Sequence, residues 1–202
     1  MRDLFAIDGT IYHYMMRLYQ LLILNLLFII CSLPIVTIGA ALTALYDVTL
    51  KMHTHDEKTV ATAYFKSFRK NFSQATQIWL MSLLVFTFAY LMMSMTKGNP
   101  FISLPLLLLI VMTVATLIYA FSLIAKFQNS TRIMLRNALL LAIQHAPYTI
   151  VMLVIAGVFC LYIPINLRWA SLLSLLLTFS LTAFVQSHFI HRILVDLSSK
   201  VK

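Results

Sequence analysis

Histidine and carboxylate side chains are the first candidates for chemistry, because they bind metals and transfer protons. Residues 53–57 read His-Thr-His-Asp-Glu and bring four possible metal ligands together. They lie in a polar stretch without cysteine or a distant partner at metal-site spacing, so we interpret them as a solvated connector. His188 and His191 are three apart and share one helix face, where anchoring at the membrane interface explains them better than metal binding. The sequence therefore predicts no metal site.

Asp47 stands out because it is the only acid within a long apolar region. An ionisable group inside a membrane span is costly and is a functional candidate by default. Counted from Pro34, Asp47 lies 13 residues along the chain in one direction and Arg17 lies 17 in the other. In a helical hairpin both would therefore lie near the same end, at a rise of about 1.5 Å per residue. We predict a structural ion pair between Arg17 and Asp47, with proton or cation coupling as the alternative.

The composition excludes a water-soluble domain and leaves little material for catalysis. Hydrophobic residues make up 61% of the 202 residues and charged residues only 10%, whereas a soluble domain carries about 25% charge. The chain has six acidic residues and no nucleophile-elbow, zincin or P-loop motif, so we expect no enzyme, no catalytic residue and no cofactor. The net charge of +9 follows the sidedness of membrane loops, so we expect no nucleic-acid partner.

Long apolar runs predict an all-α, polytopic transmembrane helix bundle, because lipid offers the backbone no hydrogen bonds and period-two alternation is absent. With six spans, 13 of the 15 Lys and Arg residues face one side, which the positive-inside rule makes cytoplasmic. We predict about six spans in the plasma membrane with both termini cytoplasmic. Five spans is the alternative, because the second run is short and contains Asp47. The runs are about Met15–Leu33, Ile35–Lys51, Ala75–Met95, Phe101–Ala125, Tyr148–Ile163 and Trp169–Ile190.

A threefold repeat of helical hairpins is one reading of the whole chain, which we treat as a single integral membrane domain over residues 1–202. Each expected outer turn carries a proline, at Pro34, Pro100 and Pro164, spaced 66 and 64 residues apart. The hairpin units would be residues 1–55, 56–127 and 128–202. Because residue identity between the units is poor, the regular spacing could instead reflect uniform span lengths.

Residues 60–73 predict a basic amphipathic helix before the third run, with aromatic side chains on one face and polar and basic side chains on the other. Such a helix would lie in the membrane interface with its cations toward anionic lipid, or under a partner protein. We expect the membrane-interface or docking residues to be Tyr64, Phe65, Lys66, Phe68, Arg69, Lys70 and Phe72.

Small residues four apart follow the first run and predict close helix packing. Such residues let helices approach closely in lipid, where van der Waals contact replaces the hydrophobic drive. The proline should end or bend the first helix, and the threonine after it is placed to cap the next one. A substrate-binding broken helix is the alternative. The packing residues are Pro34, Thr37, Gly39, Ala40, Thr43 and Ala44, and Asn25 in the first run predicts an interhelical hydrogen bond.

Three blocks of sequence resemble the YesL-like family of bacterial membrane proteins, which has no known function. They are Leu24-Asn25-Leu26-Leu27, the run from Cys31 to Ala40, and the run from Tyr64 to Thr76. The resemblance implies a small polytopic protein of the bacterial plasma membrane, often encoded near carbohydrate ABC transporters, glycoside hydrolases and two-component sensors. It supplies no catalytic residue.

Together these features favour a noncatalytic membrane protein that is an accessory or regulatory partner of carbohydrate uptake. Its partner would be a carbohydrate ABC transporter or a membrane sensor. The alternative is a small solute transporter or channel, with Asn25, Thr37, Thr43 and Asp47 lining the path.

Overall fold

The computed structural model describes residues 10–52, 59–96, 99–162 and 171–200, and within these ranges every regular element is a helix. This confirms the predicted all-helical class. Two short irregular turns, the 3-10 turn Ile35–Thr37 and the π turn Val158–Tyr162, adjoin the α-helices. The α-helices are α1 (Thr10–Ser32), α2 (Ile38–Met52), α3 (Val60–Met95), α4 (Pro100–Lys126), α5 (Thr131–Gln144), α6 (Ala146–Gly157) and α8 (Ser171–Lys200).

Among the described residues, four segments are long and apolar enough to cross a membrane. They contain α1, α2, α3 and α4, and α5 with α6 makes a fifth if the pair, bent by 98°, counts as one span. This supports an integral membrane protein, and the number of six spans stays a prediction. The third hairpin unit stays one too, because its turn at residues 163–170 lies outside the described residues.

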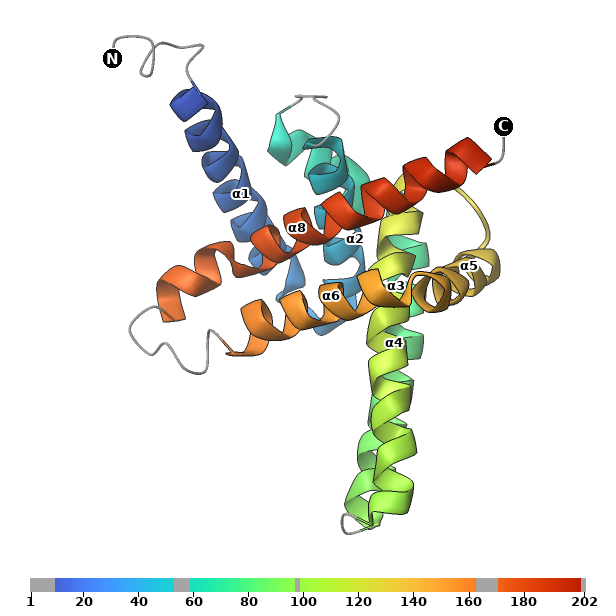
Figure 1. Cartoon of the computed structure of the whole chain (residues 1–202). Coiled ribbons are helices and arrows are strands. Elements are labelled where there is room, and N and C mark those ends of the chain that lie inside the picture. The colour runs from blue at the N-terminus through green and yellow to red at the C-terminus, as the bar shows by residue number, and fades with distance from the viewer. Residues whose placement is uncertain (1–9, 53–58, 97–98, 163–170, 201–202) are drawn as a thin grey trace.

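Helix α2 occupies the centre of the bundle, where it contacts α1, α3, α4 and α8 (Figure 1). Most of its side chains are buried, including Ala40, Ala44 and Leu45. A helix that its neighbours cover needs fewer apolar side chains than one that faces lipid. This explains why α2 is short and the least hydrophobic of the four candidate spans.

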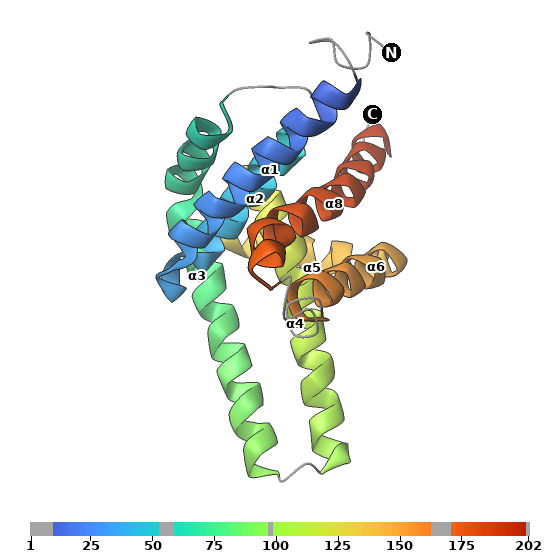
Figure 2. The same cartoon turned by 90° about the vertical axis from the view of Figure 1, so that its left-hand side faces the viewer.

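Helices α3 and α4 form a long hairpin whose outer half projects beyond the other helices (Figure 2). We call this outer half, residues 80–96 and 99–111, the hairpin tip. Large apolar side chains are exposed along it, such as Leu84, Phe88 and Leu108. The buried residues of α4 begin only at Ala115, so the tip is almost entirely outside the core.

Helix α3 is continuous over 36 residues, about 54 Å at 1.5 Å per residue. The prediction of a separate interfacial helix over residues 60–73 is therefore wrong, because these residues form the first turns of the helix that carries the third apolar run. The physical reason is visible in the sequence, since no glycine or proline lies between Val60 and Met95 to end the helix.

The turn between α1 and α2 lies beside the middle of α3 and far from its end. Trp79 Nε1 of α3 donates to the carbonyl of Ile35 at 2.8 Å. From Trp79 to Thr96, α3 rises about 25 Å, so the turns containing Pro34 and Pro100 are offset by nearly the thickness of a hydrocarbon core, about 30 Å. The two hairpins are not equivalent in depth, contrary to what a simple repeat implies.

The same turn corrects the role predicted for Thr37. Its Oγ1 donates toward the carbonyls of Cys31 and Pro34, at 2.6 and 2.7 Å. It therefore does not cap α2, which follows the 3-10 turn directly from Ile38. As expected, Pro34 follows the end of α1 at Ser32. The hydroxyl of Thr37 satisfies a carbonyl in the last turn of α1, which such a helix end leaves without an intrahelical partner.

Candidate functional site

Five helices meet around a polar cavity of about 550 Å³, which we call the basic cavity. It lies at the end of the molecule that holds the start of α1, the end of α2 and the start of α3, opposite the hairpin tip (Figures 1 and 2). Helices α4 and α8 each contribute a basic side chain, Lys126 and His191. The volume is within the range of small-ligand sites, about 300–1,000 Å³.

The wall of the basic cavity has an excess of positive charge. Among the described residues that line it, five side chains carry a full positive charge and one, that of Asp47, carries a negative charge. The first turn of α3 also faces the cavity, and the N–H groups of a helix N-terminus add partial positive charge. The cationic residues are Arg17, Lys51, Lys66, Lys70 and Lys126.

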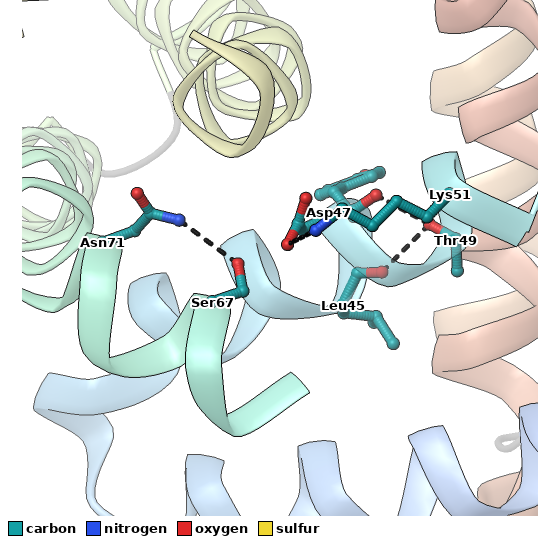
Figure 3. A network of polar contacts seen from close by, with 7 residues as sticks. Leu45, Asp47, Thr49, Lys51, Ser67 and Asn71 are labelled. Carbon is teal, nitrogen blue, oxygen red and sulfur yellow. Dashed lines mark hydrogen bonds and ion pairs between the residues drawn. The ribbon is translucent and has the colours of Figure 1, made fainter. Parts of the chain in front are cut away.

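The predicted direct ion pair between Arg17 and Asp47 is not formed. The carboxylate of Asp47 lies 2.6 Å from Lys51 Nζ, one helical turn away on α2 (Figure 3). Arg17 Nη1 instead donates to the carbonyl of Met52 at 2.8 Å, where the last turn of α2 has carbonyls without intrahelical partners. Arg17 and Asp47 thus line one cavity, as their similar separations from Pro34 along the chain indicated. Their partners differ, because Arg17 bonds to Met52 and Asp47 pairs with Lys51.

Polar side chains of α3 face Asp47 across the cavity. Asn71 Nδ2 donates to Ser67 Oγ at 3.2 Å, and both side chains are buried (Figure 3). The cavity therefore presents neutral hydrogen-bonding groups as well as charges. Of the described residues that line it, one is a carboxylate, and this group is paired with Lys51. The described wall is therefore better suited to anions than to cations.

Gln20 of α1 is the feature of the cavity that the sequence did not single out. The side chain lines the cavity and is only 7% exposed, yet its Oε1 is buried without a hydrogen-bond partner. Buried polar groups in native proteins nearly always have a partner. The available sequence signal was a glutamine within the first apolar run, because an amide in such a run needs a hydrogen-bond partner.

The aromatic face of residues 64–72 is divided between the core and the surface, and its role as a docking surface stays a prediction. Tyr64 is fully buried and its hydroxyl donates to the carbonyl of Ala41 at 3.3 Å. Phe68 is half-buried against the core, while Phe65 and Phe72 are partly exposed. The cations on this stretch are all exposed; Lys66 and Lys70 line the basic cavity, and Arg69 does not.

The small residues of α2 do form a close helix contact, and their neighbour is α3. A Cβ placed on Gly39 would lie 2.6 Å from the carbonyl oxygen of Ala75 and 2.7 Å from Trp79 Cβ. Ala40, Thr43 and Ala44 are fully buried. Thr43 Oγ1 donates to the carbonyl of Gly39 at 2.9 Å.

Asn25 makes the kind of contact that the sequence predicts, since its Oδ1 accepts a hydrogen bond from the backbone N–H of Ser180 in α8 at 3.1 Å. Asn25, Thr37 and Thr43 are therefore engaged in helix contacts, and only Asp47 of the proposed transport path lines the polar cavity. In the part of the chain that the structure describes, these four residues do not line a common path.

A second buried polar contact joins three helices and was not predicted. The hydroxyl of Tyr46 in α2 donates to Gln186 Oε1 in α8. Gln186 Nε2 in turn donates to the carbonyl of Met152 in α6 at 3.0 Å. A glutamine within an apolar run was the available signal, and only the fold shows its partners.

No group of three or more His, Cys, Asp or Glu side chains gathers at metal-binding distance among the described residues. Residues 53–57, which we interpreted as a connector, lie outside the described residues. His191 lines the basic cavity, and the ring of His188 packs edge-on to Phe189.

Residues 21–93 match a family model described as "Protein of unknown function, DUF624". The match covers the second half of α1, all of α2 and most of α3, and so includes the contact at Gly39 and the α3 wall of the basic cavity. No curated protein and no solved structure matches the chain significantly. The match supports an uncharacterised domain family over this part of the chain, and the YesL-like resemblance stays a prediction.

Proposed function

We propose that this chain is a noncatalytic integral membrane protein that acts by contacting a membrane partner, as an accessory or regulatory component of bacterial carbohydrate uptake. The observation that carries the contact role is the length of its apolar exterior. The class of partner, a carbohydrate ABC transporter or else a membrane sensor, comes from the family resemblance.

The apolar exterior is longer than one hydrocarbon core. Exposed apolar side chains of α1, from Leu18 to Ile30, lie on one side of the level of Trp79, and those of the hairpin tip lie on the other. Together these two regions extend about 45 Å along α3, compared with a core of about 30 Å. The average helix tilt of about 20° shortens this length only slightly.

Whichever region lipid covers, apolar surface of the other extends past the bilayer core. Large apolar patches that are exposed to water usually mark interaction sites. A partner protein that covers either the α1 face or the hairpin tip would remove this exposure without a polar path through the bundle. A contact role therefore fits the described helices better than solute transport does.

The test is site-specific photo-crosslinking in native membranes. A photoreactive residue replaces Leu18 or Leu26 on α1, and Leu84 or Leu108 on the hairpin tip, and the adducts are identified by mass spectrometry. We expect one region to give lipid adducts and the other to give adducts with a protein subunit of a sugar transporter. Tyr64 is the matched control, because its buried side chain should give only intramolecular adducts.

Adducts only with lipid from both regions would contradict the contact role. Reproducible protein adducts with subunits unrelated to sugar uptake would leave the contact role standing and exclude the proposed partner. Gentle detergent extraction followed by purification of the tagged chain checks the same complex without crosslinking, because a stable partner should copurify.

A further inference from the structure

We propose that the basic cavity is a binding site for a phosphate-bearing anion. This goes beyond the proposed contact role and does not depend on it. The two sources of that chemistry are the headgroup of an anionic phospholipid and a soluble phosphate compound, and the experiment below separates them.

The charge of the cavity favours an anion over any other ligand class. Three of its lysines, Lys66, Lys70 and Lys126, come from two helices and form no ion pair with any residue that the structure describes. The one acid among the described lining residues, Asp47, is neutralised by Lys51 at 2.6 Å. Like charges held around one cavity repel each other, and a bound anion removes that repulsion.

Gln20 is an independent sign of a ligand, because a buried, unpartnered amide oxygen is costly. Its side chain is more than nine-tenths buried and lines the same cavity. A protonated phosphate oxygen could donate to Oε1, and a half-turn of the amide would offer its NH2 group to an ionised one. The wall thus supplies both charge and a directional hydrogen bond, as phosphate sites require.

The location of the cavity is compatible with either source. It opens where α2 and α4 end and α3 begins. A headgroup of a lipid in the adjoining leaflet and a small soluble phosphate could both reach this end. Lysines near a membrane surface attract anionic lipid.

The first experiment measures thermal unfolding of the purified full chain in neutral detergent during a titration with inorganic phosphate. Sodium chloride keeps the ionic strength constant, because exposed charges are screened by salt. We expect a saturable rise in Tm. The double variant Lys66→Gln/Lys70→Gln should weaken the apparent affinity about tenfold or more, since each charge-assisted hydrogen bond contributes on that scale.

The matched control is Arg132→Gln/Arg136→Gln. These arginines are also four apart on one helix face and exposed, but they lie on α5 outside the cavity. The control should change the affinity less than about twofold. It removes the same charge as the cavity variant, so a nonspecific electrostatic effect would appear equally in both.

The second experiment compares nanodiscs of phosphatidylglycerol with nanodiscs of phosphatidylcholine and counts retained lipids by native mass spectrometry. Retention of phosphatidylglycerol that is lost in Lys66→Gln/Lys70→Gln, without a Tm response to phosphate, identifies the lipid headgroup as the source. A phosphate response without selective lipid retention identifies a soluble compound. If neither probe binds saturably, or if both double variants lose binding equally, the proposal is overturned.

Gln20→Leu separates a binding role from a structural one. If Gln20 serves a ligand, the variant should keep or raise the Tm without phosphate, because it removes an unsatisfied buried group, and should weaken phosphate or lipid binding at least several-fold. A lower Tm with unchanged binding would assign Gln20 to the fold and contradict its place in the site.

Discussion

Helix α2 and the hairpin tip are both apolar, but the fold places them in opposite environments. Helix α2 is shorter, contains Asp47 and Lys51, and is buried among four other helices. The hairpin tip contains the more hydrophobic sequence and is exposed on nearly every side. Hydropathy therefore measures how well a segment suits lipid, and does not measure how central it is to the protein.

The largest expected effect comes from removing the same side chain in the two regions. Leu45 in α2 is 1% exposed and Leu84 in the hairpin tip is 72% exposed. Leu45→Ala should lower the free energy of unfolding by about 2–5 kcal/mol through cavity formation, whereas Leu84→Ala should change it by less than about 0.5 kcal/mol. Reversible unfolding in mixed micelles measures both, and equal losses would show that the tip packs as a core.

The glycines give the next largest contrast. Gly39→Ala would push a methyl group into the backbone of Ala75, and we expect a loss of about 1–3 kcal/mol from overpacking. Gly157→Ala is the matched control, because a Cβ there meets nothing within 4 Å. The control should be neutral or stabilising by up to about 1 kcal/mol through helix propensity. Thermal stability in detergent checks the pair, and a neutral Gly39→Ala would mean that α2 and α3 are less closely packed.

A smaller effect is expected from the buried tyrosine of α2. Tyr46→Phe removes the donor to Gln186 and should cost about 1 kcal/mol, somewhat above the average of about 0.6 kcal/mol for interhelical hydrogen bonds in membranes. Tyr90→Phe on the exposed tip is the control and should be silent, because Tyr90 is 71% exposed. Both are measured by the same unfolding assay. Equal effects would remove the proposed link between α2, α6 and α8.

The smallest effect concerns the ion pairs at the basic cavity. A double-mutant cycle of Asp47→Asn with Lys51→Gln should show a coupling of about 0.3–0.5 kcal/mol, as for other helix pairs four apart. The cycle of Asp47→Asn with Arg17→Gln should show none, because Arg17 bonds to Met52 instead. Coupling in the second cycle alone would restore the pairing that the sequence predicted. Low salt is the suitable condition, since screening weakens both terms.

Several local features were predictable from residue types. The end of α1 before Pro34, the close contact at Gly39 and the polar contact of Asn25 all follow from chemistry that acts within a few residues or within any helix pair. The continuity of α3 was equally readable, since no residue between Val60 and Met95 interrupts a helix. Its aromatic periodicity indicated a buried face but not which surface would cover it. In the structure the protein's own core covers Tyr64, whereas Phe65 and Phe72 remain partly exposed.

The helical class and the suitability for lipid follow from the amino-acid sequence without any knowledge of the fold, because composition and apolar run length are properties of the chain alone. The sequence also places basic residues near the ends of α2 and α4 and near the start of α3. The central place of α2 and the offset of the two hairpins along α3 are visible only in the folded protein. The same is true of the cavity that cations from four helices line together with Gln20. The physical reason is that helix order, depth and rotation depend on contacts between residues far apart in the chain, which no local pattern specifies.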